Sequence, residues 1–340
     1  MILASEHYHS DKSMDKIGEI DMYLSCINHN LQLNAVGGEY ICSDGCQYQI
    51  INRIPRFVKA DNYATSFGLQ WNKFGLTQLD SYTGLSISKD RLERLAGGSL
   101  DIFNEKNVLE AGCGAGRFTE ILLKNKANVF AFDLSNAVEA NYINCYKYDK
   151  YFVCQADILT LPVKSDSFDI VVCIGVIQHT PNPEETIKKL ISYLKPGGLL
   201  IFDHYTYGYP SSFIRQFLRN ILLNISVERR FIFVNKITNT LWPLHVKLYK
   251  NSHYKTISKL RNIFLKISPI VDYHDSYPQL NSELLFQWAF LDTHDTLTDK
   301  YKHLRSVEEI EKILESNGIN KHEVYYAGNG VEARAFKSAD

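Results

Sequence analysis

The spacing of apolar and polar positions in the middle of the chain predicts an α/β arrangement. Val108, Leu109 and Ala111 form a short apolar run, three glycines follow within five residues, and an amphipathic pattern begins at Arg117. This order predicts a strand, a tight loop and a helix. Further strands are expected at 128–132, 151–155, 170–176 and 199–202, and helices at 135–148 and from about 182 to 194. The uninterrupted apolar run at 170–176 is typical of a strand buried on both faces of a parallel sheet.

The end of the chain has the signals of one helix and one hairpin. Ser306 and Glu309 have the spacing of a capping box, and Gly318 would end the helix that they begin. Two alternating stretches, 321–326 and 331–336, are joined by a glycine-rich turn. They predict a closing antiparallel hairpin.

The glycine-rich loop and the strand after it suggest a nucleoside-binding site. Glycines at 112, 114 and 116 let the backbone turn sharply and approach a ligand closely. The helix that follows offers free backbone N–H groups at its start. Asp133 ends the second strand, where a carboxylate can accept hydrogen bonds from ribose hydroxyls. A glycine loop alone also makes ordinary turns, so the later segments decide between these interpretations.

Those segments resemble the class I S-adenosylmethionine-dependent methyltransferases. The glycine spacing G-x-G-x-G after Glu110 differs from the dinucleotide pattern and resembles motif I of that family. The stretch 161–202, which begins LPVKSDSFD, resembles the family's central phrase. The resemblance covers about 20–205 and 285–338. It implies a Rossmann-like fold with a seven-stranded, mostly parallel sheet and an antiparallel C-terminal hairpin.

The resemblance also implies S-adenosylmethionine as cofactor and assigns residues to it. Glu110 would hold the methionine end, Asp133 the ribose and Asp157 the adenine amino group. A helical cap at 61–100 would cover the cofactor. The other residues expected at the cofactor are Gly112, Cys113, Gly114, Gly116, Leu134, Ile158, Ile174 and, from the cap, Gln70, Trp71 and Arg91.

Residues 20–60 resemble the small zinc-ribbon-like unit that precedes many bacterial methyltransferases. The phrase at 51–57, INRIPRF, matches the one that closes this unit. The candidate zinc ligands depart from the usual pairs of cysteines and are Cys26, His29, Cys42 and Cys46. Three cysteines and one histidine suit a tetrahedral zinc site. A degenerate ribbon that folds without metal is an equally good interpretation.

A basic, aromatic segment interrupts the family pattern at 205–284. Between 211 and 269 there are eleven Lys and Arg residues and a single acid, Glu228. A lid with solvated charges is one interpretation. The other is a surface for an anionic or lipid-linked substrate, or for an anionic membrane. Nucleic acid is disfavoured because no recognised binding module is present. The methyltransferase domain would comprise 101–204 and 285–340.

Two histidines are candidate bases for methyl transfer. His179 follows the fourth predicted strand and His204 the fifth. A histidine of near-neutral pKa suits removal of a proton from a hydroxyl or a ring nitrogen. Packing over the cofactor is the alternative role for His179. The phrase at 290–295, FLDTHD, resembles one from methyltransferases of bacterial surface-polysaccharide clusters, and we expect His294 to lie in a structural turn held by Asp292 and Asp295.

We therefore expect methyl transfer to an oxygen or nitrogen of a small molecule, such as a sugar or sugar nucleotide. The alternatives are a lipid or quinone methyltransferase at a membrane surface and a non-catalytic cofactor-binding protein of the same fold. Oligomeric state and acceptor are left open.

Composition narrows the setting. The 340 residues are 45% hydrophobic and have a formal net charge of −1, so the whole molecule has no field that steers it toward nucleic acid. Seven cysteines, an odd number, indicate reduced thiols. The first ten residues have neither a basic start nor an apolar run, which predicts a cytoplasmic protein.

Overall fold

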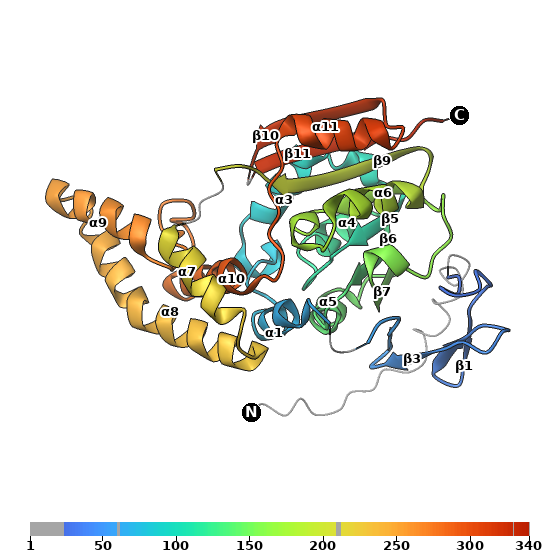
Figure 1. Cartoon of the computed structure of the whole chain (residues 1–340), viewed down its shortest axis with the longest axis horizontal. Helices are drawn as coiled ribbons and strands as arrows, with labels where there is room; N and C mark the ends of the chain where they lie inside the picture. Colours follow the sequence, from blue (N-terminus) through green and yellow to red (C-terminus); the bar gives the residue numbers. More distant parts are fainter. Residues whose placement is uncertain (1–23, 60–61, 209–211, 329, 340) are drawn as a thin grey trace.

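The computed structural model describes residues 24–59, 62–208, 212–328 and 330–339. Residues 20–23, 60–61, 209–211, 329 and 340 of the expected units lie outside this set, as does the N-terminal stretch. A central sheet lies between helices, a small sheet lies at one end, and a group of helices lies at the other (Figure 1).

The central sheet has seven strands in the order β10-β11-β9-β8-β5-β6-β7. Strands β5 to β9 run parallel to one another, whereas β11 runs antiparallel to both β9 and β10. The strands are β5 (Asn107–Ala111), β6 (Asn128–Asp133), β7 (Tyr151–Gln155), β8 (Phe168–Cys173), β9 (Leu194–Tyr205), β10 (Lys321–Ala327) and β11 (Gly330–Phe336). The predicted seven-stranded, mostly parallel sheet with an antiparallel C-terminal hairpin is confirmed.

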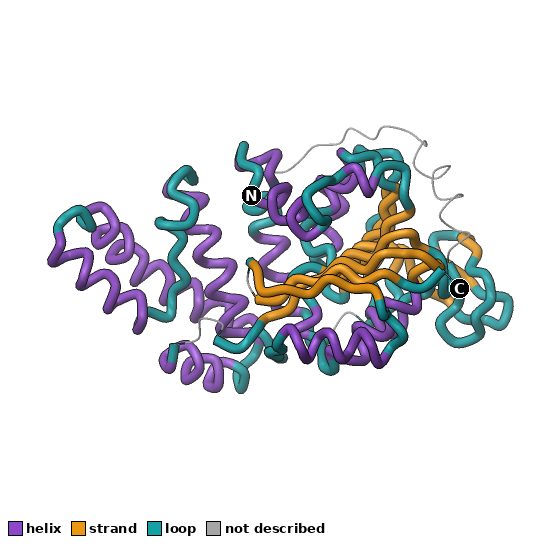
Figure 2. The backbone as a smooth tube through the Cα atoms, turned by 90° about the horizontal axis from the view of Figure 1, so that it is seen from above, coloured by secondary structure: helices purple, strands orange, loops and turns teal. Residues whose placement is uncertain are grey.

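Two apolar layers hold helices against the two faces of this sheet, which Figure 2 shows nearly edge-on. Leu109 and Ala111 of β5 pack with α6 (Pro183–Tyr193) and α11 (Val307–Ser316). Val108 packs on the opposite face with α3 (Ile87–Leu95), α4 (Thr119–Lys124) and α5 (Val138–Cys145). Successive side chains of a strand point to opposite faces, so one apolar run serves both layers.

The small N-terminal unit is a four-stranded antiparallel sheet. Its strands are β1 (Asn34–Val36), β2 (Glu39–Ile41), β3 (Gln47–Ile51) and β4 (Ile54–Pro55). Phe57 donates its backbone N–H to the carbonyl of Gln155 at 2.8 Å. Leu24 and Tyr40 belong to the apolar layer beneath the central sheet, so the unit is packed onto the domain.

The cap and the insertion are helical. The cap contains α1 (Thr65–Lys73), α2 (Asp80–Thr83) and α3. The insertion contains α7 (Phe213–Leu222), α8 (Val227–Lys250) and α9 (Lys255–Ile267), and α10 (Ser282–Thr298) follows it. Helix α10 packs against α7 and α8. The expected boundary between 284 and 285 therefore falls inside a helix that lies with the insertion.

Several local predictions can be compared with the elements. The capping box of Ser306 and Glu309 is present at the start of α11, and the hairpin is β10–β11. The helix expected to end at Leu194 ends at Tyr193, and the strand expected at 199–202 is longer than predicted, because β9 already begins at Leu194. All seven cysteines are free thiols.

Among the described residues, no helix is both long and apolar enough to cross a membrane.

Candidate active site

The glycine loop lies at the carboxyl end of β5 and forms the floor of a cavity of about 600 Å³. Gly112 has φ of +77° and packs so closely on Val176 that a Cβ would lie 2.3 Å from a valine methyl group. Gly114 has φ of +49° and faces the indole of Trp71, which is 3.6 Å from where a Cβ would stand. Both positions have left-handed backbone, which favours glycine, and at Gly112 the contact with Val176 also excludes a side chain.

Asp133 joins the end of β6 to this loop. Its Oδ2 accepts a hydrogen bond from the N–H of Gly114 at 3.0 Å. Its Oδ1 accepts two, from the N–H and the hydroxyl of Ser135, at 2.8 and 2.7 Å. Burial raises the pKa of Asp133, and these hydrogen bonds oppose the rise. Because Oδ1 already has two donors, Oδ2 has more capacity left for a ligand hydroxyl.

Glu110 lies beneath the loop and does not line the cavity. It is 3% exposed, and its Oε2 accepts a 2.6 Å hydrogen bond from the hydroxyl of Thr119. Asn141 donates to that hydroxyl and, at 3.4 Å, to the carbonyl of Cys113. Burial raises the pKa of Glu110 to about 8. In this structure Glu110 therefore braces the loop from below.

The other predicted cofactor residues divide into those that line the cavity and those that do not. The lining ones are Gly112, Cys113, Gly114, Leu134, Ile158, Ile174, Gln70, Trp71 and Arg91, together with Asp133. Gly116 and Asp157 are not among the lining residues. Asp157 lies one residue before the lining Ile158, and its carboxylate accepts the N–H of Leu159 at 2.8 Å.

Arg91 forms an ion pair with Asp203 of β9, whose other oxygen accepts the N–H of Gly175 at 2.6 Å. Arg117, which follows the glycine loop directly, has neutral partners instead. It donates to Ser88 Oγ at 3.0 Å and to Gln78 Oε1 at 2.5 Å. Burial, followed by repulsion from Arg91, lowers the pKa of Arg117 to about 10, so it remains cationic at neutral pH. Among the described residues, no carboxylate lies within ion-pair distance of Arg117.

His179 lines the cavity and His204 does not. His179 Nδ1 lies 3.2 Å from the carbonyl oxygen of Tyr301 and 3.3 Å from Asp299 Oδ2. Burial by itself lowers the pKa of His179, but Asp295 and Asp299 raise it above its ordinary value. His204 is 1% exposed and donates from Nδ1 to the carbonyl of Tyr205, and burial lowers its pKa to about 4.

Helix α10 and the segment before it supply a cavity wall that sequence reasoning missed. Tyr273, Tyr277 and Trp288 contact one another with ring centroids 5.1–6.3 Å apart, and all three line the cavity. Asp292 accepts a short hydrogen bond from the hydroxyl of Tyr273, and burial raises its pKa to about 6. Residues 273–288 contain no recognisable sequence motif, so only the packing of the folded chain identifies this wall.

The turn expected around His294 is wrong, because the phrase lies inside α10. A helix places Asp292 and Asp295 three residues apart on one face, and both line the cavity. His294 lies outside the cavity lining. It donates from Nδ1 to Gln70 Oε1 at 2.6 Å and connects α10 to the cap.

The four candidate zinc ligands lie together in the small N-terminal unit. One ligand atom from each of Cys26, His29, Cys42 and Cys46 lies within 4.8 Å of the others. The Nδ1 of His29 is 3.3–3.8 Å from the three sulfurs. Ligands about 2.0–2.3 Å from a shared tetrahedral zinc ion are separated by roughly these distances, so the donor set fits zinc.

Comparison with known proteins supports the assignment of the central domain. Residues 109–202 match the family model described as a methyltransferase domain. A ubiquinone biosynthesis O-methyltransferase of Coxiella burnetii is 36% identical over 101 residues, which are 29% of this chain and 43% of that protein. A malonyl-[acyl-carrier protein] O-methyltransferase of a Paenibacillus species is 28% identical over 167 residues, 45% of this chain and 58% of the relative. These alignments thus span about half the length of the relatives.

Among solved structures, the chain is similar to a protein of Methanococcus maripaludis to which S-adenosylmethionine-dependent methyltransferase activity has been assigned. The TM-score of this match is 0.44. That protein is 13% identical, and the alignment covers 83% of this chain and 96% of that one. The topology of the sheet and the matched segment agree with each other. The segment that matches the methyltransferase family model, residues 109–202, therefore lies within a sheet that has the strand order expected for that family.

Proposed function

We propose that the protein transfers a methyl group from S-adenosylmethionine to an oxygen or nitrogen of a small molecule. The observation that carries this proposal is the cavity of about 600 Å³ that joins the glycine loop, Asp133 and the cap. When bound, the cofactor supplies a methyl group activated by its sulfonium. The protein then has to align the acceptor, exclude water and receive a proton.

The residues around the cavity fit the parts of that cofactor. Asp133 Oδ2 has acceptor capacity for a ribose hydroxyl, and Leu134 and Ile158 offer an apolar edge for the adenine. Arg117 is the cation without a carboxylate partner next to the glycine loop. Arg117 is therefore a better candidate than Arg91 for the cofactor's carboxylate, because Arg91 already pairs with Asp203. Trp71 covers the loop from the cap.

An oxygen atom is the better supported acceptor. The names of the two relatives given above both specify O-methylation. The aromatic wall of Tyr273, Tyr277 and Trp288 suits a ring, and nearby carboxylates suit hydroxyl groups. We therefore propose phenols, sugars and sugar nucleotides as the compounds to screen.

The test is calorimetric titration with S-adenosylhomocysteine. We expect micromolar binding that Asp133→Ala removes, because the change deletes the ribose acceptor and releases Gly114. Asp169→Ala is the matched control, since that carboxylate binds Asn107 and Lys195 and does not line the cavity. Retained affinity in Asp133→Ala would contradict the assigned site. Binding without methyl transfer to any compound of the panel would favour a non-catalytic role.

A lipid or quinone acceptor is the second candidate. Helix α7 exposes Phe213, Phe217 and Ile221, and α9 exposes Ile263 and Ile267. These side chains recur at helical spacing within the segment that contains eleven basic residues and one acid. Such a surface is typical of proteins that bind an anionic bilayer.

We also propose that the small N-terminal unit holds one structural zinc ion through Cys26, His29, Cys42 and Cys46. The convergence of the four ligand atoms supports this proposal. The purified protein should contain about one zinc per chain, and Cys42→Ser should lose it. Zinc content near zero in protein purified without chelator would favour a ribbon that folds on its apolar residues alone.

A further inference from the structure

Asp295 is the least satisfied carboxylate of the cavity wall. Its side chain is 23% exposed, and its Oδ1 is buried without a hydrogen-bond partner. Its Oδ2 forms no hydrogen bond with any described residue, and Asp295 is one of the residues that line the cavity. A buried polar atom without a partner is costly, and such atoms concentrate at functional sites.

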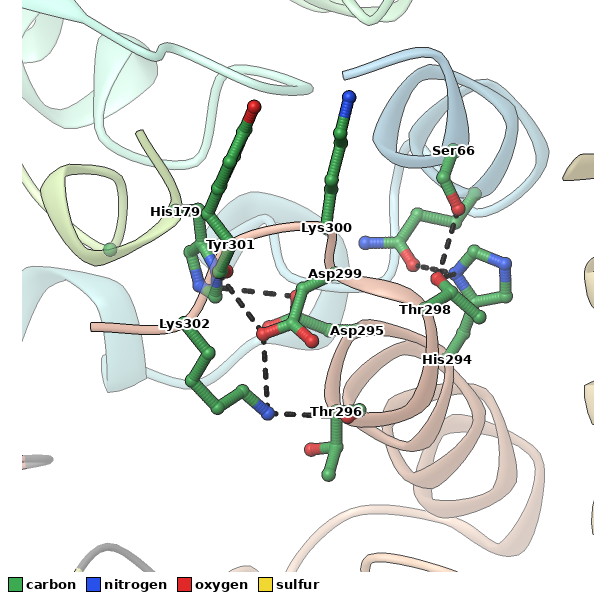
Figure 3. A network of polar contacts seen from close by, with 12 residues as sticks. Ser66, His179, His294, Asp295, Thr296, Thr298, Asp299, Lys300, Tyr301 and Lys302 are labelled. Atoms are coloured by element: carbon green, nitrogen blue, oxygen red, sulfur yellow. Dashed lines mark hydrogen bonds and ion pairs between the residues drawn. The ribbon is translucent and has the colours of Figure 1, made fainter. Parts of the chain in front are cut away.

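His179, Asp299 and Lys302 form a row of polar side chains next to Asp295, as Figure 3 shows. His179 Nε2 is 4.0 Å from Asp295 Oδ1, and His179 Nδ1 is 3.3 Å from Asp299 Oδ2. Asp299 is 1% exposed and is held by Lys302 Nζ at 3.2 Å. Asp295 is thus the most exposed member of the row toward the cavity.

The insertion completes this row from outside the methyltransferase domain. Arg219 of α7 donates from Nε to Asp299 Oδ1 at 2.6 Å. Its Nη2 donates to the backbone carbonyls of Asp299 and Lys300 at 2.7 and 3.1 Å. One side chain of the insertion therefore fixes both the carboxylate and the backbone of the segment that contacts His179.

We propose that Asp295 is a catalytic residue, which accepts a hydrogen bond from the acceptor's hydroxyl group and takes its proton, and that His179, Asp299 and Arg219 are positioning residues. This proposal rests on the methyltransferase function proposed above. As the acceptor oxygen bonds to the methyl carbon, its proton moves to Asp295 Oδ2. The bond between methyl and sulfur breaks, and its electron pair stays on sulfur.

The electrostatics agree with this assignment. Burial raises the pKa of Asp295 above its ordinary value, and Asp299 adds to the rise, whereas His179, Lys302 and Arg219 oppose it. Asp292, on the same face of α10, is a further carboxylate that interacts with Asp295. A carboxylate with a raised pKa is a stronger base than an exposed one, and general bases typically contribute about 10²–10⁴-fold in rate.

A divalent cation is the competing explanation for these groups. One ligand atom from each of His179, Asp295 and Asp299 lies within 4.8 Å of the others. Arg219 and Lys302 already neutralise Asp299, and two cations next to a ligand disfavour a third. Transfer that EDTA abolishes and magnesium restores would overturn the proposed role of Asp295 as a proton acceptor.

The first experiment requires no acceptor. Protein labelled with ¹³C at the aspartate carboxyl carbons and saturated with S-adenosylhomocysteine is titrated by NMR, and Asp295→Asn assigns the signal. We expect Asp295 to titrate above the ordinary range for aspartate. His179→Gln should raise its pKa further, because a neighbouring cation is lost. An ordinary pKa that is unaffected by His179→Gln would overturn the proposal.

The second experiment measures methyl transfer to the phenols and sugars of the panel. Asp295→Asn should lower kcat at least 100-fold while the affinity for S-adenosylhomocysteine stays within threefold, and Asp295→Glu should restore part of the rate. A rate within threefold of wild type in Asp295→Asn would overturn the proposal. Failure of the wild-type protein to bind S-adenosylhomocysteine would instead count against the proposed methyltransferase function.

Arg219→Gln tests the link to the insertion. The acid limb of the pH–rate profile should move to higher pH, because Arg219 lowers the pKa of Asp295. Arg215→Gln is the matched control on the same helix, since Arg215 donates to the carbonyls of Pro269 and Ile270. An unshifted profile in Arg219→Gln, or an equal shift in both variants, would remove Arg219 from the positioning residues.

Discussion

Gly112 shows how one residue of the loop depends on a neighbour from another strand. Its Cβ would collide with Val176 after β8, and its φ of +77° disfavours any side chain. We expect Gly112→Ala to lower the free energy of unfolding by about 2–4 kcal/mol through overpacking and left-handed strain. It should also weaken S-adenosylhomocysteine binding at least tenfold. Urea denaturation and calorimetry check both effects.

Gly84→Ala is the control for the conformational part of that effect. Gly84 has a similar φ of +72°, and a Cβ there would meet nothing within 4 Å. Its substitution should cost about 1 kcal/mol and leave binding unchanged. Equal losses for both variants would mean that Val176 does not constrain the loop.

Glu110 should make the stability of the protein depend on pH. Its folded pKa of about 8 lies above the value of about 4.3 in an unfolded chain. Between these values the unfolded chain loses the proton that the folded protein keeps. The free energy of unfolding should therefore fall as pH rises, by up to about 1.4 kcal/mol per unit.

Glu110→Gln removes this titration and preserves an acceptor for Thr119. Relative to the wild type, the variant should gain stability steadily from pH 5.5 to 7.5, as measured by urea denaturation. Asp169→Asn is the control, because the pKa of Asp169 is lowered and its carboxylate is ionised throughout that interval. Parallel curves for the wild type and Glu110→Gln would show that Glu110 is ionised in the folded protein.

At the scale of elements, the insertion is held together by a buried carboxylate. Asp272 accepts hydrogen bonds from His245 of α8 at 2.6 Å and from His274 at 2.8 Å, and Arg261 of α9 lies 3.4 Å away. Burial raises the pKa of Asp272, but the bonds from the two histidines hold it well below its usual range. One side chain thus links α8, α9 and the segment before α10.

Asp272→Asn should lower the free energy of unfolding by about 3 kcal/mol, since it removes the charge that compensates buried donors. Hydrogen exchange should accelerate in α8 and α9 and remain slow in β5 and β8. Asp275→Asn is the control, because Asp275 binds the same Arg261 while its side chain is 65% exposed. Uniform acceleration across the sheet would show that the insertion and the domain unfold as one unit.

At the scale of the whole molecule, the exposed apolar side chains of α7 and α9 predict peripheral membrane binding. We expect the protein to float with phosphatidylglycerol vesicles at low salt, to float less at 0.5 M salt, and not to float with phosphatidylcholine vesicles. Substituting Phe213 and Phe217 with serine should abolish flotation. Ile143→Ser on α5 is the control, because Ile143 is 68% exposed and lies outside the insertion. If the wild-type protein does not float with these vesicles, the insertion serves only as a wall of the cavity.

Much of the fold could be predicted because its signals are local. The apolar runs gave the strands of the central sheet, and the spacing of Ser306 and Glu309 gave the start of α11. The strand predicted at 199–202 was too short, because pairing with neighbouring strands extends β9 back through a Pro-Gly-Gly segment that by itself favours a turn. The turn predicted around His294 was wrong because packing against α7 and α8 stabilises a helix at 290–295.

The sequence by itself determined the class of fold, the glycine loop and Asp133, since each depends on residues close together in the chain. The sequence also identified His179 as a candidate base, but it did not identify the residues that contact His179. Only the tertiary structure decided that Arg91 pairs with Asp203, that Glu110 lies beneath the loop, and that His204 faces away from the cavity. The row from Asp295 to Arg219 joins residues 76 positions apart through side chains. Such contacts depend on how helices pack in space, and no local pattern in the sequence encodes that packing.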